Sequence, residues 1–182
     1  MEPLYQNALH KKETLQDYDR ILFMDSDVLV NNDCPNIFDV VPEDHIGSIY
    51  EDVGTRFHDR HRKMFAMQRQ WGDLGWPAGY TNAGVFVVSK EHAPIFDPHN
   101  GKYCLGWGSA DLHMAYMAKK NGFPIHELPF QWNHMTMFSE AWNKHADRFE
   151  SHMIHYAGRG TFDTSSRIDQ IRKDAEEIRR RA

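Results

Sequence analysis

The chain has 182 residues, enough for about one domain with a core that needs neither disulfides nor a structural metal. Lys and Arg number 21 against 26 Asp and Glu, and the net charge of −5 argues against a general nucleic-acid-binding surface. The opening residues lack an apolar signal-like run, and no segment approaches the roughly 20 apolar residues that span a bilayer. We therefore expect a cytoplasmic protein without a transmembrane segment, in which Cys34 and Cys104 are reduced thiols.

The predicted elements alternate between helices and short apolar strands. Sequence patterns predict helices over 3–16, 56–70, 110–121 and 139–147. Apolar blocks predict strands over 21–24, 46–50, 84–88, 125–128 and 153–155. This alternation is typical of an α/β domain in which helices sandwich a parallel or mixed sheet, and we expect that domain to cover residues 1–162.

A separate amphipathic helix is expected within residues 163–182. Ser165 and Ser166 can cap its start, and three arginines lie where the helix dipole favours cations. The apolar stripe expected over 166–181 consists of Ile168, Ile171, Ala175 and Ile178.

The first candidate functional motif is Asp25-Ser26-Asp27, which directly follows the apolar run 21–24. Residues i and i+2 of an extended chain project to the same side, so both carboxylates can face one Mg²⁺ or Mn²⁺ ion. Ligands commonly bind beyond the carboxyl ends of strands in α/β proteins. A pair of solvated turn aspartates is the structural alternative.

Two further segments suit either a binding site or ordinary structure. Asn82 and Gly84 lead into the predicted strand residues Val85 to Val88, where an amide side chain and a glycine backbone favour the approach of a ligand. Taken alone, an ordinary turn before the strand is the better explanation of this segment. Asp111 opens a predicted helix and either stabilises the helix dipole or accepts hydrogen bonds from substrate hydroxyls.

His155 ends a predicted strand and is followed by a glycine–arginine loop. Gly158 and Gly160 flank Arg159, an arrangement able to wrap a phosphate. The segment 56–69 is locally basic and suits either an anionic ligand or a solvated helix face.

These pieces, in this order, resemble family 8 glycosyltransferases, the glycogenin and lipopolysaccharide galactosyltransferase group with the GT-A (Rossmann-like) fold. The resemblance spans roughly residues 18–160. The matching segments are YDRILFMDSDVLVNND, YTNAGVFVVSK, SADLHMAYMAKKNG, LPFQWN and HMIHYAG.

The resemblance implies a retaining hexosyltransferase that uses a nucleotide-sugar donor, usually UDP-linked, and Mn²⁺, with Mg²⁺ as the alternative. The acceptor is left open between a glycan, a lipid-linked molecule and a protein. The implied metal ligands are Asp25, Asp27 and His155; the implied catalytic residues are Asp111 and Gln131; the implied substrate-binding residues are Asn82, Gly84, Gly158 and Arg159.

Two departures from the family pattern shape these expectations. Arg159 stands where the family usually has a lysine. The family also places two or three strands before the Asp-x-Asp motif, whereas 24 residues precede Asp25 here. We therefore expect an N-terminally shortened sheet whose exposed edge offers a contact for a homo-oligomer.

Two other functions fit parts of the sequence. A nucleotide-sugar or glycan-binding module without activity is favoured by the short N-terminus. A haloacid-dehalogenase-like phosphatase would use Asp25 as nucleophile, but its lysine should follow the first motif, and none occurs between Asp27 and Glu51.

Overall fold

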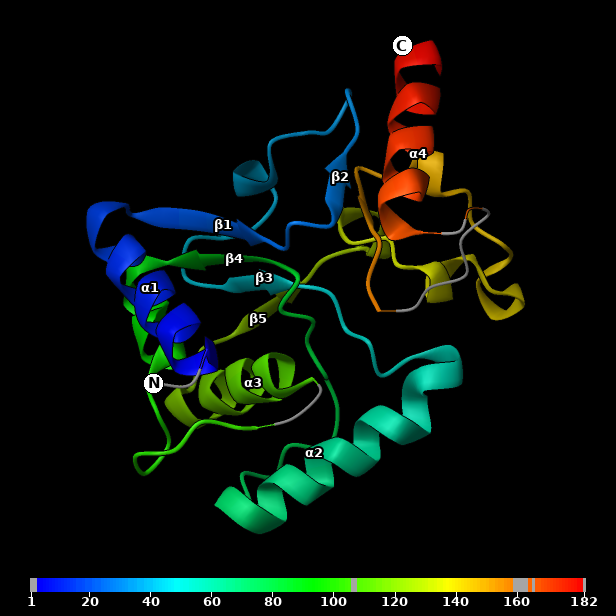
Figure 1. The fold of residues 1–182 in the computed structure, drawn as a ribbon. Coiled ribbons are helices and arrows are strands. Elements are labelled where there is room, and N and C mark those ends of the chain that lie inside the picture. Colours follow the sequence, from blue (N-terminus) through cyan, green and yellow to red (C-terminus); the bar gives the residue numbers. More distant parts are fainter. Residues whose placement is uncertain (1–2, 106–107, 159–163, 165, 182) are drawn as a thin grey trace.

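The computed structural model describes residues 3–105, 108–158, 164 and 166–181, and its centre is a four-stranded mixed sheet (Figure 1). The strands lie in the order β1 (Arg20–Met24), β4 (Val85–Ser89), β3 (Ile46–Ser48) and β5 (Ile125–Glu127). β4 runs antiparallel to both of its neighbours, and β3 pairs in parallel with β5. The predicted α/β class and mixed sheet are confirmed.

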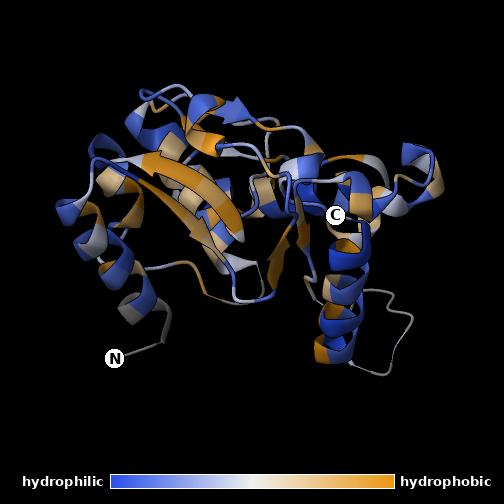
Figure 2. Ribbon diagram, turned by 90° about the horizontal axis from the view of Figure 1, so that it is seen from above, coloured by the Kyte–Doolittle hydropathy of each residue, from blue (hydrophilic) through white to orange (hydrophobic). Residues whose placement is uncertain are grey.

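Strand β4 is buried along its whole length because both faces of the sheet are covered. Phe86 and Val88 belong to a core shared with helices α1 (Pro3–Asp17), α2 (Phe57–Trp71) and α3 (Ser109–Asn121). Val85 and Val87 point the other way, into a core shared with the short turns of residues 130–138. Figure 2 shows the central strands as the most hydrophobic part of the ribbon.

A second, two-stranded sheet lies beside the first. Strand β2 (Val28–Val30) pairs antiparallel with β6 (Met153–His155), and Val28 is opposite His155. Helix α4 (Arg167–Arg181) lies next to this ribbon, at the end of the molecule away from α1 (Figure 1). The ribbon therefore joins the first quarter of the chain to its last.

The expected helix over 139–147 is wrong. That region forms short 3₁₀ turns, η5 (Thr136–Ser139), η6 (Ala141–Asn143) and η7 (Arg148–Glu150). Lys144 and His145 have φ values of 58° and 51°, a left-handed conformation that an α-helix cannot contain. The strand expected over 46–50 also ends early, and Tyr50 forms only an isolated bridge with Thr81.

Helix α4 is confirmed, but its buried face differs from the expected stripe. Ile168 is 62% exposed, whereas Gln170 and Asp174 are almost fully buried together with Ile178. Asp174 accepts hydrogen bonds from Arg148, Tyr156 and Gln170. A buried carboxylate therefore fixes this helix to the rest of the protein, together with Ile178 and Ile171 of the expected stripe, which pack in an apolar cluster with Ile154 and Tyr156.

Ser166 acts as the expected cap, because the Asp169 N–H donates to its Oγ atom at 3.2 Å. Ser165 lies outside the described residues. Cys34 and Cys104 are free thiols. Within the described part of the chain, no helix has both the length and the apolar character needed to cross a membrane.

Candidate active site

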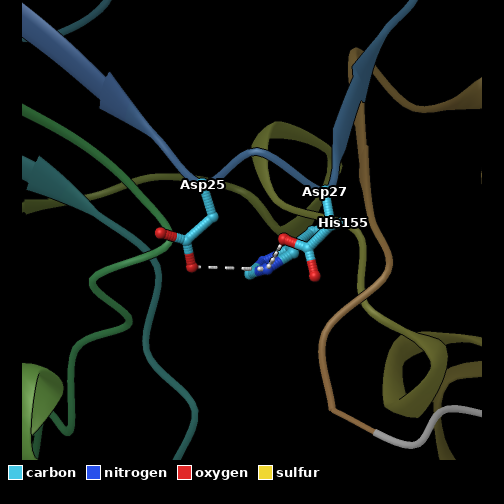
Figure 3. A group of neighbouring side chains, drawn as sticks. All are labelled: Asp25, Asp27 and His155. Carbon is cyan, nitrogen blue, oxygen red and sulfur yellow. Dashed lines mark ion pairs between the residues drawn. The ribbon is translucent and has the colours of Figure 1, made fainter. Parts of the chain in front are cut away.

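Asp25, Asp27 and His155 converge at the junction of the two sheets (Figure 3). Asp25 follows β1, Asp27 precedes β2, and the pairing of β2 with β6 brings His155 opposite. Nε2 of His155 lies 3.3 Å from Oδ1 of Asp27 and 3.8 Å from Oδ2 of Asp25. One ligand atom from each residue falls within 4.8 Å of the others, a spacing that suits a single divalent cation.

Asn133 sets the orientation of the His155 ring. Its side-chain Nδ2 donates to Oδ1 of Asn82 at 2.7 Å, so its own Oδ1 is the atom 2.8 Å from Nδ1 of His155. Since an amide oxygen only accepts, Nδ1 carries the proton and Nε2 presents a lone pair to the carboxylates. Burial lowers the pKa of His155 despite the attraction of Asp27 and Asp25, which favours the neutral, metal-binding form.

Gly84 lies directly beneath this imidazole ring. Asn82 Oδ1 accepts from its N–H at 2.8 Å, and its carbonyl accepts from the N–H of Asp25 at 2.7 Å. The close approach of the ring leaves no room for a side chain here. Gly84 therefore contributes through its missing Cβ atom, which lets the His155 ring approach the backbone.

A buried polar chain continues behind Asn82. Its amide nitrogen donates to Oε1 of Glu51, and Arg60 donates to Oε2 of the same carboxylate, at 2.8 Å from Nε. Arg60 is almost fully buried, so it does not belong to the solvated basic face suggested for residues 56–69. The Asn82 amide thus holds the surrounding structure in place, and its oxygen is fully used by Gly84 and Asn133.

Asp111, in the first turn of α3, reaches the same site from the opposite side. Its Oδ1 atom accepts from the N–H of Ala83 at 2.7 Å. Burial, reinforced by the charge of Glu51, raises the pKa of this carboxyl to about 7. Asp111, expected either to stabilise the helix dipole or to bind substrate hydroxyls, therefore lies in the site.

Lys11 of helix α1 also enters this region. Its ammonium lies 5.0 Å from the centre of the Phe86 ring. Burial lowers its pKa, while Asp25 and Asp111 act in the opposite direction. Nothing in the local sequence distinguishes Lys11 from the neighbouring Lys12, which pairs with Asp97 instead.

A cavity of about 1360 Å³ connects these groups. Seven of the expected site residues line it: Asp25, Asp27, Asn82, Gly84, Asp111, His155 and Gly158. Gln131 does not line it, because it lies in the turn η4 (Phe130–Trp132). Arg159 lies outside the described residues.

Sequence reasoning missed Asn133 and Arg167. Asn133 ends the segment LPFQWN, in which Gln131 was the expected site residue, and the 3₁₀ turn directs the later residue toward His155. Arg167, the first residue of α4, lies with Nη1 2.5 Å from Oδ2 of Asp27 and donates through Nη2 to the carbonyl of Gly158. No motif marks either residue.

Comparison with known proteins assigns this arrangement to a class. The structure resembles the WbbM bifunctional glycosyltransferase (TM-score 0.57, 17% identity, 98% of this chain and 37% of that one). It also resembles a glycosyltransferase involved in the glycosylation of the major capsid of PBCV-1 (0.54, 16%, 97% and 75%). A third similar structure is the galactosyltransferase LgtC in complex with donor and acceptor sugar analogues (0.53, 16%, 93% and 64%). The fold is therefore that of GT-A glycosyltransferases.

The sequence profile of glycosyl transferase family 8 matches residues 9–92, which contain Asp25, Asp27, Asn82 and Gly84. This match agrees with the resemblance to family 8 glycosyltransferases noted from the sequence. None of the curated protein sequences matches the chain. The chain spans 37% of the length of WbbM and about two thirds to three quarters of the other two proteins.

Proposed function

We propose that this protein transfers a sugar, with retention of configuration, from a nucleotide-sugar donor, most simply a UDP-sugar, in a Mn²⁺-dependent reaction. The observation that carries the proposal is the triad of Asp25, Asp27 and His155, with the histidine lone pair aimed at two carboxylates. An imidazole beside two carboxylates suits Mn²⁺ better than Mg²⁺, which prefers all-oxygen ligands.

Different residues around the cavity would bind the two ends of the donor, which are the diphosphate and the sugar. A divalent cation held by the triad would stabilise the charge that develops on the diphosphate leaving group. Asp111, held by the Ala83 N–H on the other side of the cavity, would accept hydrogen bonds from the donor sugar hydroxyls. Lys11 adds a positive charge between Asp25 and Asp111.

The test measures turnover of UDP-glucose and UDP-galactose with and without Mn²⁺. The readout is the release of UDP. We expect Mn²⁺-dependent release in the wild type and its loss in Asp27→Asn. Tight UDP binding without any turnover would indicate the binding module instead. Release of phosphate from a phosphomonoester would indicate the phosphatase chemistry that Asp25 alone suggests.

A further inference from the structure

Arg167 forms an ion pair with one of the three triad residues. Asp27 divides its oxygens between two partners, with Oδ1 toward His155 at 3.3 Å and Oδ2 toward Arg167 at 2.5 Å. The other guanidinium nitrogen donates to the Gly158 carbonyl. The side chain of Asp27 is 15% exposed and that of Arg167 is 40% exposed, so the ion pair is buried on its carboxylate side and open to solvent on its guanidinium side.

Two features fix Arg167 in this position. The buried Asp174 holds α4 against Arg148 and Tyr156, the residue that follows His155. Ser166 caps the first turn of the same helix through the Asp169 N–H. The start of α4 is therefore anchored where the guanidinium reaches Asp27.

We propose that Arg167 is a built-in counter-ion that competes with the divalent cation for Asp27 and makes metal binding depend on the nucleotide. Arg167 occupies one carboxylate oxygen of Asp27, so a cation that binds at the triad meets a nearby guanidinium and has to compete with it for that carboxylate. The inference rests on the proposed metal and nucleotide-sugar site.

A diphosphate changes this balance. It offers the guanidinium a second anionic partner beside the site, so Arg167 no longer opposes the metal. Metal and nucleotide then strengthen each other's binding by the same factor. Arg167 is in this sense a positioning residue, which sets the coupling between the two ligands.

The experiment measures Mn²⁺ binding alone, from the electron paramagnetic resonance signal of free Mn²⁺, and then repeats the titration with UDP. In Arg167→Gln, we expect Mn²⁺ alone to bind about tenfold more tightly than in the wild type. UDP should then tighten Mn²⁺ binding by a smaller factor than in the wild type. Arg167→Met repeats the test without an amide that could bind Asp27.

The matched control is Arg172→Gln, which removes the same charge from an exposed position of the same helix, where Arg172 pairs only loosely with Asp169 at 3.7 Å. It should leave both titrations unchanged. Equal Mn²⁺ affinity in the wild type and both Arg167 variants would overturn the competition. Absence of Mn²⁺ binding in all of them would overturn the metal site itself, and with it the Mn²⁺ dependence of the proposed function.

Discussion

Gly84 and His155 are packed so closely that they exclude any other residue at position 84. An ideal Cβ atom on Gly84 would lie 2.3 Å from Cε1 of the imidazole and 3.0 Å from Nδ1. The backbone of Gly84 is not in the left-handed region, so the requirement for glycine comes from the ring and not from the main chain. Gly84, the residue before β4, thereby limits how closely the His155 ring approaches the backbone.

Gly84→Ala should weaken Mn²⁺ binding at least about tenfold, because the ring must move away from Asp27 to make room for a methyl group. The measurement is a Mn²⁺ titration beside a thermal melt. Gly101→Ala is the control, since a Cβ atom there meets nothing within 4 Å. With its φ of 75°, Gly101→Ala should lower stability by about 1 kcal/mol and leave metal binding intact. Unchanged Mn²⁺ affinity in Gly84→Ala would contradict the close packing.

Asn133→Ala should also weaken Mn²⁺ binding, by about 10- to 100-fold, because the proton of His155 Nδ1 loses the acceptor that fixes the ring and its tautomer. Asn143→Ala serves as control, because Asn143 makes a comparable amide bond, to the Phe138 carbonyl at 2.8 Å, away from the triad. If both variants bind Mn²⁺ as the wild type does, Asn133 has no part in orienting the ligand.

Asp111→Asn should reduce sugar transfer about 10- to 150-fold while UDP binding stays within a few-fold of the wild type. The variant keeps the size of the side chain and its acceptor oxygen for the Ala83 N–H, but loses the charge offered to sugar hydroxyls. Transfer rates and UDP calorimetry on the same preparation separate the two effects. A parallel loss of UDP binding would place Asp111 nearer the diphosphate than we propose.

The raised pKa of Asp111 predicts a pH-dependent penalty on stability. The folded-state value of about 7 lies above the ordinary 3.8, so between these values the folded protein holds a proton that the unfolded chain has released. The contribution of this group to stability therefore falls as pH rises from about 4 to 7.

Urea unfolding at pH 5 and pH 8 measures this effect. Relative to the wild type, Asp111→Asn should gain about 1–4 kcal/mol in the free energy of unfolding on going from the lower to the higher pH. An identical pH dependence in both proteins would mean that Asp111 is solvated enough to keep an ordinary pKa.

The sequence predicts those parts of the fold in which a local pattern matches a local structure. The apolar run of 84–88 became the buried strand β4, and the motif Asp25-Ser26-Asp27 lies at the end of β1 as expected. The region 139–147 has helix-forming residues, but its turns are set by packing of Phe138 and by left-handed residues that composition does not reveal. On α4, Ile171 and Ile178 pack inward as predicted, but the exposed Ile168 and the buried Asp174, paired with Arg148, depart from the predicted stripe.

The expected metal ligands came together because each is fixed by a strand end, whereas their supporting residues are not recognisable locally. Asn133 acts from a 3₁₀ turn, Arg167 from a helix start and Lys11 from the middle of α1. Their roles depend on tertiary placement, which no residue spacing encodes. Gln131 illustrates the converse, since it matched a motif but lies outside the cavity.

The β2–β6 pairing also has a consequence for the order in which the molecule folds. It pairs residues 123 to 127 positions apart, from Val30 with Met153 to Val28 with His155, and Asp27 meets His155 only after this ribbon has formed. Closing so long a loop is entropically costly, and contacts of high sequence separation form slowly. Partly folded chains, including those emerging during synthesis, would therefore lack the triad and leave cellular divalent ions unbound. During refolding, metal uptake should lag behind recovery of the central sheet and mark the moment at which the last strand is in register.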